Sequence, residues 1–387
     1  MTDNRTVNKS RVALVACADY DQRRVYRAMS RGLELVGGIS SFVQPGEKIL
    51  IKPNVLFGVS PDRCVCTHPE VFRAAGRLLA GAGASLTCGD SPGFGGCRAN
   101  MALGGLKKVA DELGIPLADF ARGRAVTHPG ALLTRRFVIA NGVLAADGLV
   151  SLPKLKTHGL TRFTGAVKNQ FGCVPGLMKG PQHARLPDPF KFATMLVDLN
   201  TLLRPRLYIM DAVMAMEGNG PRNGSPRKLG VLLLSADPIA LDAVACKIID
   251  LDPAFVPTSA PGEKAGLGTY HFENIEMVGD AIEDFICPDF NVVRKPPLPA
   301  SGGRMAAFIK NRTSARPVIN ADRCTRCGAC VRHCPVTPRA VDWRGEDKRR
   351  PPSHDYNLCI RCFCCQEVCP EAAISVKETL LGKIIFR

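Results

Sequence analysis

The sequence predicts an α/β fold, with a mostly parallel sheet and helices on both faces, followed by a small C-terminal α+β domain. In the first part, short apolar runs alternate with segments whose apolar residues recur every three or four positions. The runs lack polar alternation, as expected of strands buried on both sides. Near the C-terminus, eight of the seventeen cysteines fall in two copies of one spacing. At 387 residues the chain is too long for one core, so more than one domain is expected.

The elements follow in order along the chain. Strands are predicted at residues 11–16, 48–52, 85–88, 148–152, 206–210 and 229–234. Helices are predicted at residues 25–36, 68–80, 100–113 and 238–249, the last with proline in its first turn. We therefore expect an α/β domain over residues 1–290, a basic linker at 291–316, the cysteine-rich domain at 317–377 and a tail at 378–387.

Polar side chains gather just after several predicted strands. In an open α/β sheet, ligands bind in the crevice outside the carboxyl ends of the strands. These residues should therefore meet at one edge of the sheet; they are Lys52, Asn54, Asp90, Ser91, Lys154, Lys156, His158 and Asp211.

The densest segment, residues 152–172, contains no acidic residue. Its cations are Lys154, Lys156, His158, Arg162 and Lys168. A charge run is often a solvated face, but interleaved glycines and threonines favour the wall of an anion-binding pocket. We expect an anionic small molecule there, with His158, Lys156 and Asp90 as catalytic groups. The expected substrate-binding residues are Lys52, Asn54, Ser91, Lys154, Arg162, Lys168, Asn169 and Asp211.

Two glycine-rich segments are open to two interpretations each. Residues 89–96 could cradle a phosphate or carboxylate with backbone amides, or form a plain turn. Residues 217–228 could be a flap over an anion, or a solvated loop. The linker, with its basic residues and prolines, could grip an acidic electron carrier or simply separate the domains.

The net charge of +16 is not a nucleic-acid signal in this chain. One tryptophan and five tyrosines offer little for base stacking, and no nucleic-acid-binding motif is visible, so no nucleic-acid partner is expected. No apolar run reaches the length of a membrane span, and the N-terminus lacks a secretory signal. Many cysteines without such a signal predict a reducing cytoplasmic location.

The two cysteine motifs share one spacing, C-x2-C-x2-C-x3-C-P. Three closely spaced cysteines hold three corners of an iron–sulfur cube, and the fourth ligates the other cluster in two-cluster ferredoxins. Paired C-x2-C motifs also bind zinc, but zinc explains neither the third cysteine nor the repeated Cys-Pro. The sequence therefore predicts two [4Fe–4S] clusters and a redox partner protein. The ligands would be Cys324, Cys327, Cys330 and Cys369 for cluster 1, and Cys359, Cys362, Cys365 and Cys334 for cluster 2.

Eight short motifs between residues 11 and 290 resemble the domain-of-unknown-function 362 family. They are KPN at 52–54, THPE at 67–70, GDSPG at 89–93, LPKLKTH at 152–158, GAVKN at 165–169, FGCVPG at 171–176, MEGNGP at 216–221 and DPIALD at 237–242. The resemblance implies the architecture, often with a two-cluster ferredoxin-type unit behind it, but no reaction. The chain departs from the family pattern at Cys64 and Cys66, which could be a redox pair, metal ligands or small packed residues. Cys173 could be a reactive thiolate or a packed side chain.

These observations favour an iron–sulfur oxidoreductase that exchanges electrons with an anion held in the α/β domain. The alternative is a non-catalytic electron-transfer or maturation subunit that docks a partner enzyme. A third hypothesis is a hydrolase or transferase whose clusters are only structural.

Overall fold

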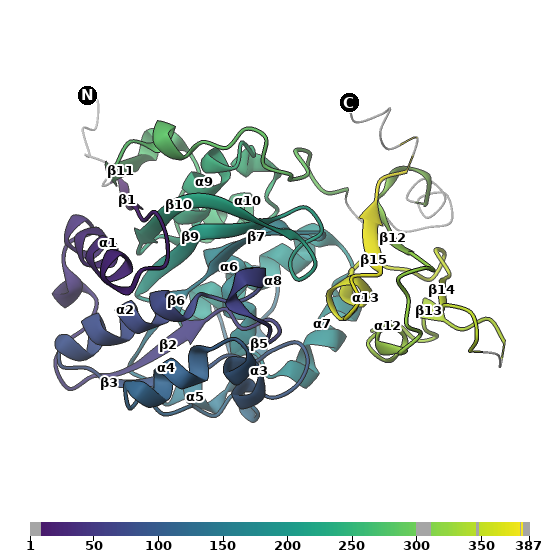
Figure 1. Ribbon diagram of the computed structural model, residues 1–387, viewed down its shortest axis with the longest axis horizontal. Coiled ribbons are helices and arrows are strands. Elements are labelled where there is room, and N and C mark those ends of the chain that lie inside the picture. The colour runs from purple at the N-terminus through teal and green to yellow at the C-terminus, as the bar shows by residue number, and fades with distance from the viewer. Residues whose placement is uncertain (1–8, 299–310, 346–347, 380, 382–387) are drawn as a thin grey trace.

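The computed structural model describes residues 9–298, 311–345, 348–379 and 381. An α/β domain forms the larger part, and the C-terminal domain packs against one side of it (Figure 1). Most of the predicted tail (residues 380 and 382–387) and the middle of the predicted linker (residues 299–310, including Arg304 and Lys310) lie outside the described residues.

A nine-stranded sheet runs through the described part of the α/β domain. Five of its eight strand pairs are parallel, so the predicted mostly parallel sheet is confirmed. Seven strands follow one another in the order β11 (Ile275–Gly279), β1 (Ser10–Ala16), β10 (Ser225–Ser235), β9 (Leu207–Glu217), β6 (Gly148–Leu152), β2 (Lys48–Pro53) and β3 (Ser85–Cys88). The remaining two are β7 (Lys154–His158), which pairs with β9, and β8 (Arg162–Thr164), which pairs with β7. A separate hairpin joins β4 (Gly123–Thr127) to β5 (Arg136–Ala140).

Helices cover both faces of the sheet, as predicted. Successive residues of a strand point to opposite faces, so Ile49 and Ile51 pack on one side and Leu50 on the other. The first face is covered by α1 (Gln22–Leu35), α2 (Pro69–Gly81), α3 (Cys97–Leu103) and α4 (Leu106–Glu112). The second face is covered by α5 (Asn141–Leu144), α6 (Ala166–Asn169), α8 (Pro189–Leu203), α9 (Pro238–Ile248) and α10 (Ser259–Lys264).

Two elements differ from the sequence prediction. The helix expected at 100–113 is two helices, because Gly104 and Gly105 interrupt it and Gly105 adopts φ +77°. The segment 154–158, expected only to follow the strand at 148–152, is a strand itself. Its buried lysines are tolerated because each ammonium group reaches a partner, as described below.

The C-terminal domain is a small α+β unit. It has two short ladders, β12 (Arg316–Ile319) with β15 (Ile374–Lys377) and β13 (Val341–Asp342) with β14 (Ser353–His354). Its short helices are α12 (Ala329–Arg332) and α13 (Cys364–Glu367). None of the helices in the described part of the chain is long and apolar enough to cross a membrane.

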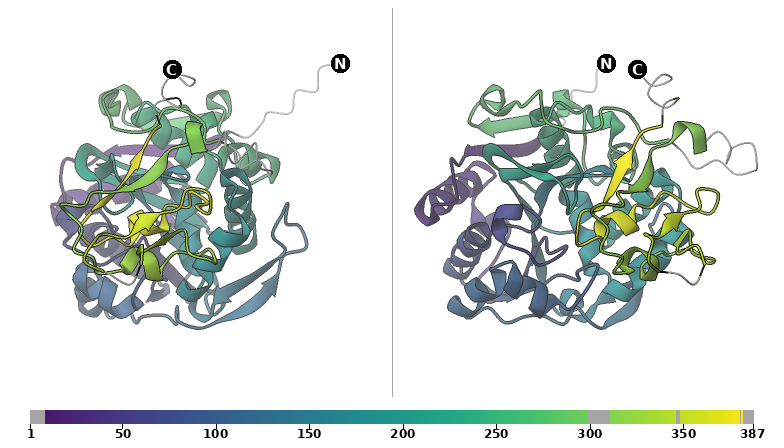
Figure 2. Two further views of the ribbon diagram at one scale, coloured as in Figure 1. Left: turned by 90° about the vertical axis from the view of Figure 1, so that its right-hand side faces the viewer. Right: turned by 45° about the vertical axis from the view of Figure 1, so that its right-hand side comes forward.

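The two domains are closely packed rather than separated by the linker (Figure 2). The loop between β9 and β10 reaches α13, where Gln366 Nε2 donates to Asn219 O at 2.8 Å and Asn223 Nδ2 donates to Gln366 O at 3.0 Å. Phe363, only 5% exposed, joins the hydrophobic cluster of the α/β domain beside Leu160. The middle of the glycine-rich segment, residues 218–224, is therefore a docking loop between β9 and β10, an interpretation that the sequence did not suggest.

Candidate functional site

The first ion pair of the site joins two neighbouring strand ends. Lys52, at the end of β2, has its ammonium 2.9 Å from Asp90 Oδ1, and both side chains are almost fully buried. Asp90 also accepts hydrogen bonds from the amides of Val55 at 2.6 Å and Ser91 at 2.9 Å. A Cβ at Gly172 would clash with Asp90 Oδ1 and Lys52 Nζ. The backbone at residue 172 can therefore approach the ion pair this closely only because the residue is glycine. The pair ties together the loops that follow β2 and β3.

A second buried ion pair lies between β7 and β9. Lys154 Nζ is 2.8 Å from Asp211 Oδ2, and it donates to the hydroxyl oxygen of Tyr20 at 2.7 Å. Tyr20 in turn donates to Asp211 Oδ1 at 2.8 Å. Each ion of this pair is compensated and hydrogen-bonded, the condition for burying charge at low cost.

Lys156 is buried without an acidic partner. Its ammonium donates to Asn54 Oδ1 and to Val65 O, each at 2.6 Å. Burial lowers the pKa of Lys156 to about 7, although the Cys66 thiol and Glu367 oppose this. An anion beside Lys156 would favour its charged form.

Lys168 and Lys179 approach the ring of Phe171. Their ammonium nitrogens lie 5.4 and 5.6 Å from its centroid, within cation–π range. Lys179 also donates to Ser91 O. Burial lowers the pKa of Lys168 and brings that of Lys179 to about 8, so both sites favour a bound anion.

His158, at the end of β7, faces the C-terminal domain. Its Nδ1 accepts hydrogen bonds from the amides of Leu160 at 3.0 Å and Thr161 at 3.4 Å, so the proton of the neutral ring lies on Nε2. Nε2 is 3.2 Å from Glu367 Oε1, an ion-pair distance without hydrogen-bond geometry. Burial lowers the pKa of His158. Although burial opposes it, the nearby His158 and Lys168 hold the pKa of Glu367 down at about 2.

These groups surround one cavity of about 1230 Å³ between the two domains. The α/β domain contributes polar side chains to its lining; they are Asn54, Asp90, Ser91, Arg98, Asp119, Lys154, Lys156, His158, Thr164, Lys168, Asn169, Lys179, His183 and Arg185. The C-terminal domain contributes Arg332, His333, Cys334, Cys364 and Glu367. The glycine-rich loop after β3 also lines the cavity, on the same edge of the sheet as β7.

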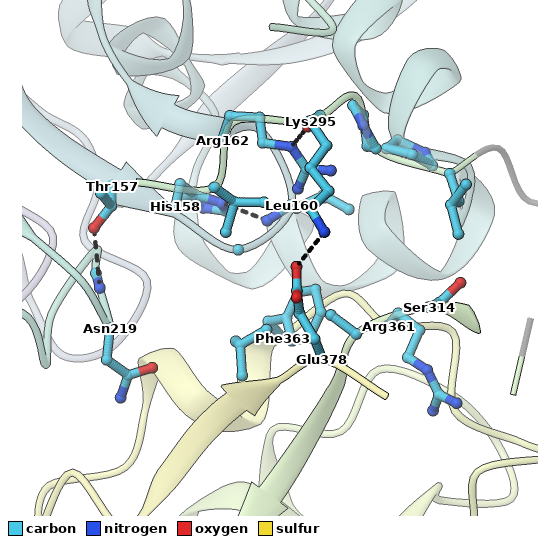
Figure 3. A pocket seen from close by; sticks show the side chains of 18 of the residues that line it. Thr157, His158, Leu160, Arg162, Asn219, Lys295, Ser314, Arg361, Phe363 and Glu378 are labelled. Atoms are coloured by element: carbon cyan, nitrogen blue, oxygen red, sulfur yellow. Dashed lines mark hydrogen bonds and ion pairs between the residues drawn. The ribbon is translucent and has the colours of Figure 1, made fainter. Parts of the chain in front are cut away.

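Three residues predicted to bind the substrate do not line this cavity. Lys52 and Asp211 lie behind it, as partners of Asp90 and Lys154. Arg162 instead lines a second cavity of about 360 Å³, which His158 also lines (Figure 3). There it donates to Lys295 O at 2.5 Å, because the β7–β8 turn, with φ +68° at Arg162, carries its guanidinium away from the lysines.

Several cavity residues were not predicted from the sequence, among them Lys179, His183 and Glu367. Lys179 and His183 lie on α7 (Lys179–Arg185), four positions apart, which is a one-face helical spacing that could have revealed them. Glu367 belongs to the cysteine-rich domain, and no local pattern shows that it reaches the other domain.

The eight motif cysteines form two groups that cross the two motifs. A small cavity is lined by Cys324, Cys327, Cys330 and Cys369. Burial, and then the neighbouring thiols of this group, raise the pKa of Cys330 to about 11. The thiols near Cys365 are those of Cys362, Cys359, Cys330 and Cys334, so Cys334 of the first motif lies among cysteines of the second, and Cys330 of the first group is also close.

This donor set fits iron–sulfur clusters. In the described residues, no three His, Cys, Asp or Glu side chains are placed to hold a single metal ion. Two sets of four thiols, each crossing the motifs, are instead what two [4Fe–4S] cubes need, and the ligand assignment remains a prediction. When bound, such clusters supply one-electron transfer.

The remaining cysteines of interest are packed thiols. Cys64, Cys66 and Cys173 are buried. Burial raises the pKa of all three, that of Cys173 to about 12, and a thiol held protonated is a poor nucleophile.

The fold and the site define an α/β protein with a C-terminal iron–sulfur domain. Residues 316–370 match the model of a 4Fe-4S dicluster domain, a kind of domain that binds [4Fe–4S] clusters and transfers electrons. Residues 49–247 match the family described as Domain of unknown function (DUF362). The chain belongs to this family, as its motifs indicated.

Similar proteins include a thylakoid-associated protein and a dehydrogenase subunit. The chain is 40% identical over 257 residues to the "Thylakoid-associated protein sll1697" of Synechocystis sp., covering 66% of this chain and 79% of that one. It is 30% identical over 107 residues to the "NADH-dependent phenylglyoxylate dehydrogenase subunit delta" of Aromatoleum evansii, covering 27% of this chain and 90% of that one. Among solved structures, lactate racemase apoprotein from Thermoanaerobacterium thermosaccharolyticum matches at 11% identity with a TM-score of 0.40, covering 63% of this chain and 58% of that one.

Proposed function

We propose that this protein transfers electrons through two [4Fe–4S] clusters to or from an anionic substrate or cofactor held in the interdomain cavity. One observation carries the proposal. The lysines of the α/β domain and Cys334, a predicted ligand of cluster 2, line the same cavity. A group bound there would be in contact with the cations and beside the cluster.

The cations divide into two kinds with different roles. Lys52 and Lys154 are compensated by Asp90 and Asp211, and they shape the site. Lys156, Lys168 and Lys179 are the cations that an anion would engage, because burial without full compensation favours a negative ligand. His158 carries a proton on Nε2 at the cavity wall, and because its ring is neutral this N–H is proposed to donate a hydrogen bond to the bound group rather than to give up its proton.

The test is anion binding by the full-length protein with its clusters reconstituted anaerobically. Sulfate should raise the melting temperature, because a ligand at 100 times its Kd stabilises the folded state by about 2.7 kcal/mol. Replacing Lys168→Met should weaken this effect and leave the iron content unchanged. Lys108→Met, an exposed position on α4, is the matched control.

Equal sulfate stabilisation of the wild type, Lys168→Met and Lys108→Met proteins would overturn the substrate site. Mass spectrometry of small molecules released from anaerobically purified protein should identify the native anion. That anion should compete with sulfate.

The second candidate is a non-catalytic electron-transfer or maturation subunit that docks a partner enzyme. It is favoured by relatives whose names record them as subunits, including "Pyruvate synthase subunit PorD" of Methanocaldococcus jannaschii, 32% identical over 71 residues. Copurification of a partner enzyme, with no small molecule and no sulfate effect, would support this candidate.

A further inference from the structure

A rim of basic side chains surrounds the loop that carries Cys327. Arg326 Nη1 donates to Arg349 O at 2.8 Å, and Arg332 Nη1 donates to Cys327 O at 2.9 Å. Lys348 Nζ lies 5.0 Å from the centroid of Trp343, whose ring leaves no room for a Cβ at Gly328. We call Arg326, Arg332, Lys348 and Arg349 the cluster 1 rim; all four are exposed.

The two cysteine groups differ in their access to solvent. Cys327, in the first group, is exposed, although Cys330 and Cys369 of that group are buried. In the second group Cys365 is buried and its other members are only partly exposed. Phe363, next to Cys362 in the second group, is packed into the α/β domain. The side of the first group that carries Cys327 therefore faces the outside, whereas Cys334 of the second group lines the interdomain cavity.

The charge around the first group is strongly positive. The sequence from residue 323 to 350 contains eight basic and three acidic residues. Two acidic side chains, Asp322 and Glu371, are exposed close to the same loop, and Glu371 lines the small cavity between the cysteines of this group. The cations outnumber these carboxylates, so the surface favours a negatively charged partner.

We propose that the cluster 1 rim is the docking surface for an acidic electron-carrier protein. This inference rests on the proposed electron-transfer function, and it names the partner's charge and its place of contact. The rate of electron transfer falls steeply with the distance between donor and acceptor. A carrier must therefore dock where a cluster lies near the surface, and the exposed Cys327 marks that place. The rim is an exposed surface rather than an enclosed pocket, so it fits a protein better than a small anion.

The test is binding of an acidic plant-type [2Fe–2S] ferredoxin, as a probe, to the full-length protein with its clusters. Isothermal titration calorimetry should give a Kd that rises about tenfold or more between low and high salt, as screening removes the attraction. Lys348→Glu/Arg349→Glu should weaken binding about tenfold at low salt and flatten its salt dependence. Arg326→Gln should have a smaller effect in the same direction.

The control is Arg23→Glu/Arg27→Glu, which reverses two exposed charges on α1, at the far end of the α/β domain (Figure 1). Unchanged binding by the rim variants at full iron content, or an equal loss in the α1 variant, would overturn the proposal. Tighter, rim-dependent binding of a DNA duplex or of anionic phospholipid vesicles would overturn it too. The sulfate assay, made on the same rim variants, separates the docking-surface hypothesis from the anion-site hypothesis. Ferredoxin binding through the rim without any sulfate effect would support the docking surface and contradict the anion site.

Discussion

Sulfate affinity should fall steeply as the pH rises from 6 to 9. Lys156 and Lys179, with pKa values of about 7 and about 8, change charge in this range. Both pKa values are lowered, so each lysine is charged below its pKa and neutral above it. An anion binds the charged forms, and binding is therefore strong at low pH and is lost as the pH passes 7 and then 8.

The size of the effect follows from these two pKa values. Both lysines are mostly protonated at pH 6, whereas at pH 9 about 1% of Lys156 and about 10% of Lys179 remain charged. If binding needs both charges, the affinity falls about a thousandfold, or roughly 4 kcal/mol. At pH 7.5 binding should also take up about one proton.

Other charges facing these lysines act in known directions. Cys66 and Glu367 raise the pKa of Lys156, whereas Lys168 and Lys154 lower it. For Lys179, Asp90 and Cys173 raise the pKa, and Lys52 and Lys168 lower it.

Isothermal titration calorimetry in two buffers of different ionisation enthalpy measures both the affinity and the proton uptake. Sulfate is the right probe because its own charge is constant over this range. In Lys156→Met the sulfate affinity should fall only about tenfold between pH 6 and 9, with the change centred near pH 8. In Lys108→Met it should still fall about a thousandfold. A flat affinity between pH 6 and 9, or no proton uptake, would refute the electrostatic reasoning.

Two further predictions concern the clusters and the domain contact. Anaerobic reconstitution should give about eight iron and eight sulfide per chain; Cys369→Ala should remove the cluster of Cys324, and Cys334→Ala the cluster of Cys359, as electron paramagnetic resonance of the reduced variants would show. Loss of the wrong cluster would contradict the crossed ligand sets. Phe363→Ala should cost about 3–5 kcal/mol of stability, because it removes a buried ring from the α/β cluster, and a melting curve and limited proteolysis between the domains would measure it. Unchanged melting and proteolysis would show that the two domains do not depend on this contact. The control is Leu358→Ala, a change at an exposed residue of the same domain, which should leave both measurements unchanged.

The sequence predicted the strands best where the buried residues are apolar. The strands β1, β2, β3 and β6 are apolar runs, so their pattern alone predicts them. The residues of β7 alternate lysine with apolar or hydroxyl side chains, and only the carboxylate of Asp211 on β9 explains how Lys154 can be buried there. The same pairing extends β9 beyond its predicted end at residue 210, so Asp211 lies within the strand instead of following it.

The candidate site was predicted in part for a similar reason. Strand ends meet at one edge of a sheet, which brought Asp90, Lys154, Lys156 and His158 together as expected. Arg162 escaped this rule because the backbone turns at that residue. Glu367 could not have been predicted, since its position depends on docking between surfaces distant in sequence.

The burial of Phe363 couples the proposed binding of cluster 2 to the proposed binding of an anion in the interdomain cavity. This ring lies between two cysteines of the second motif and is held in the α/β domain, so the loop that wraps cluster 2 also forms part of the cavity wall. Oxidative loss of that cluster would release the loop, and with it Glu367 and the outer wall of the anion site. On the proposed function, loss of cluster 2 would therefore change the wall of the anion site and electron transfer together.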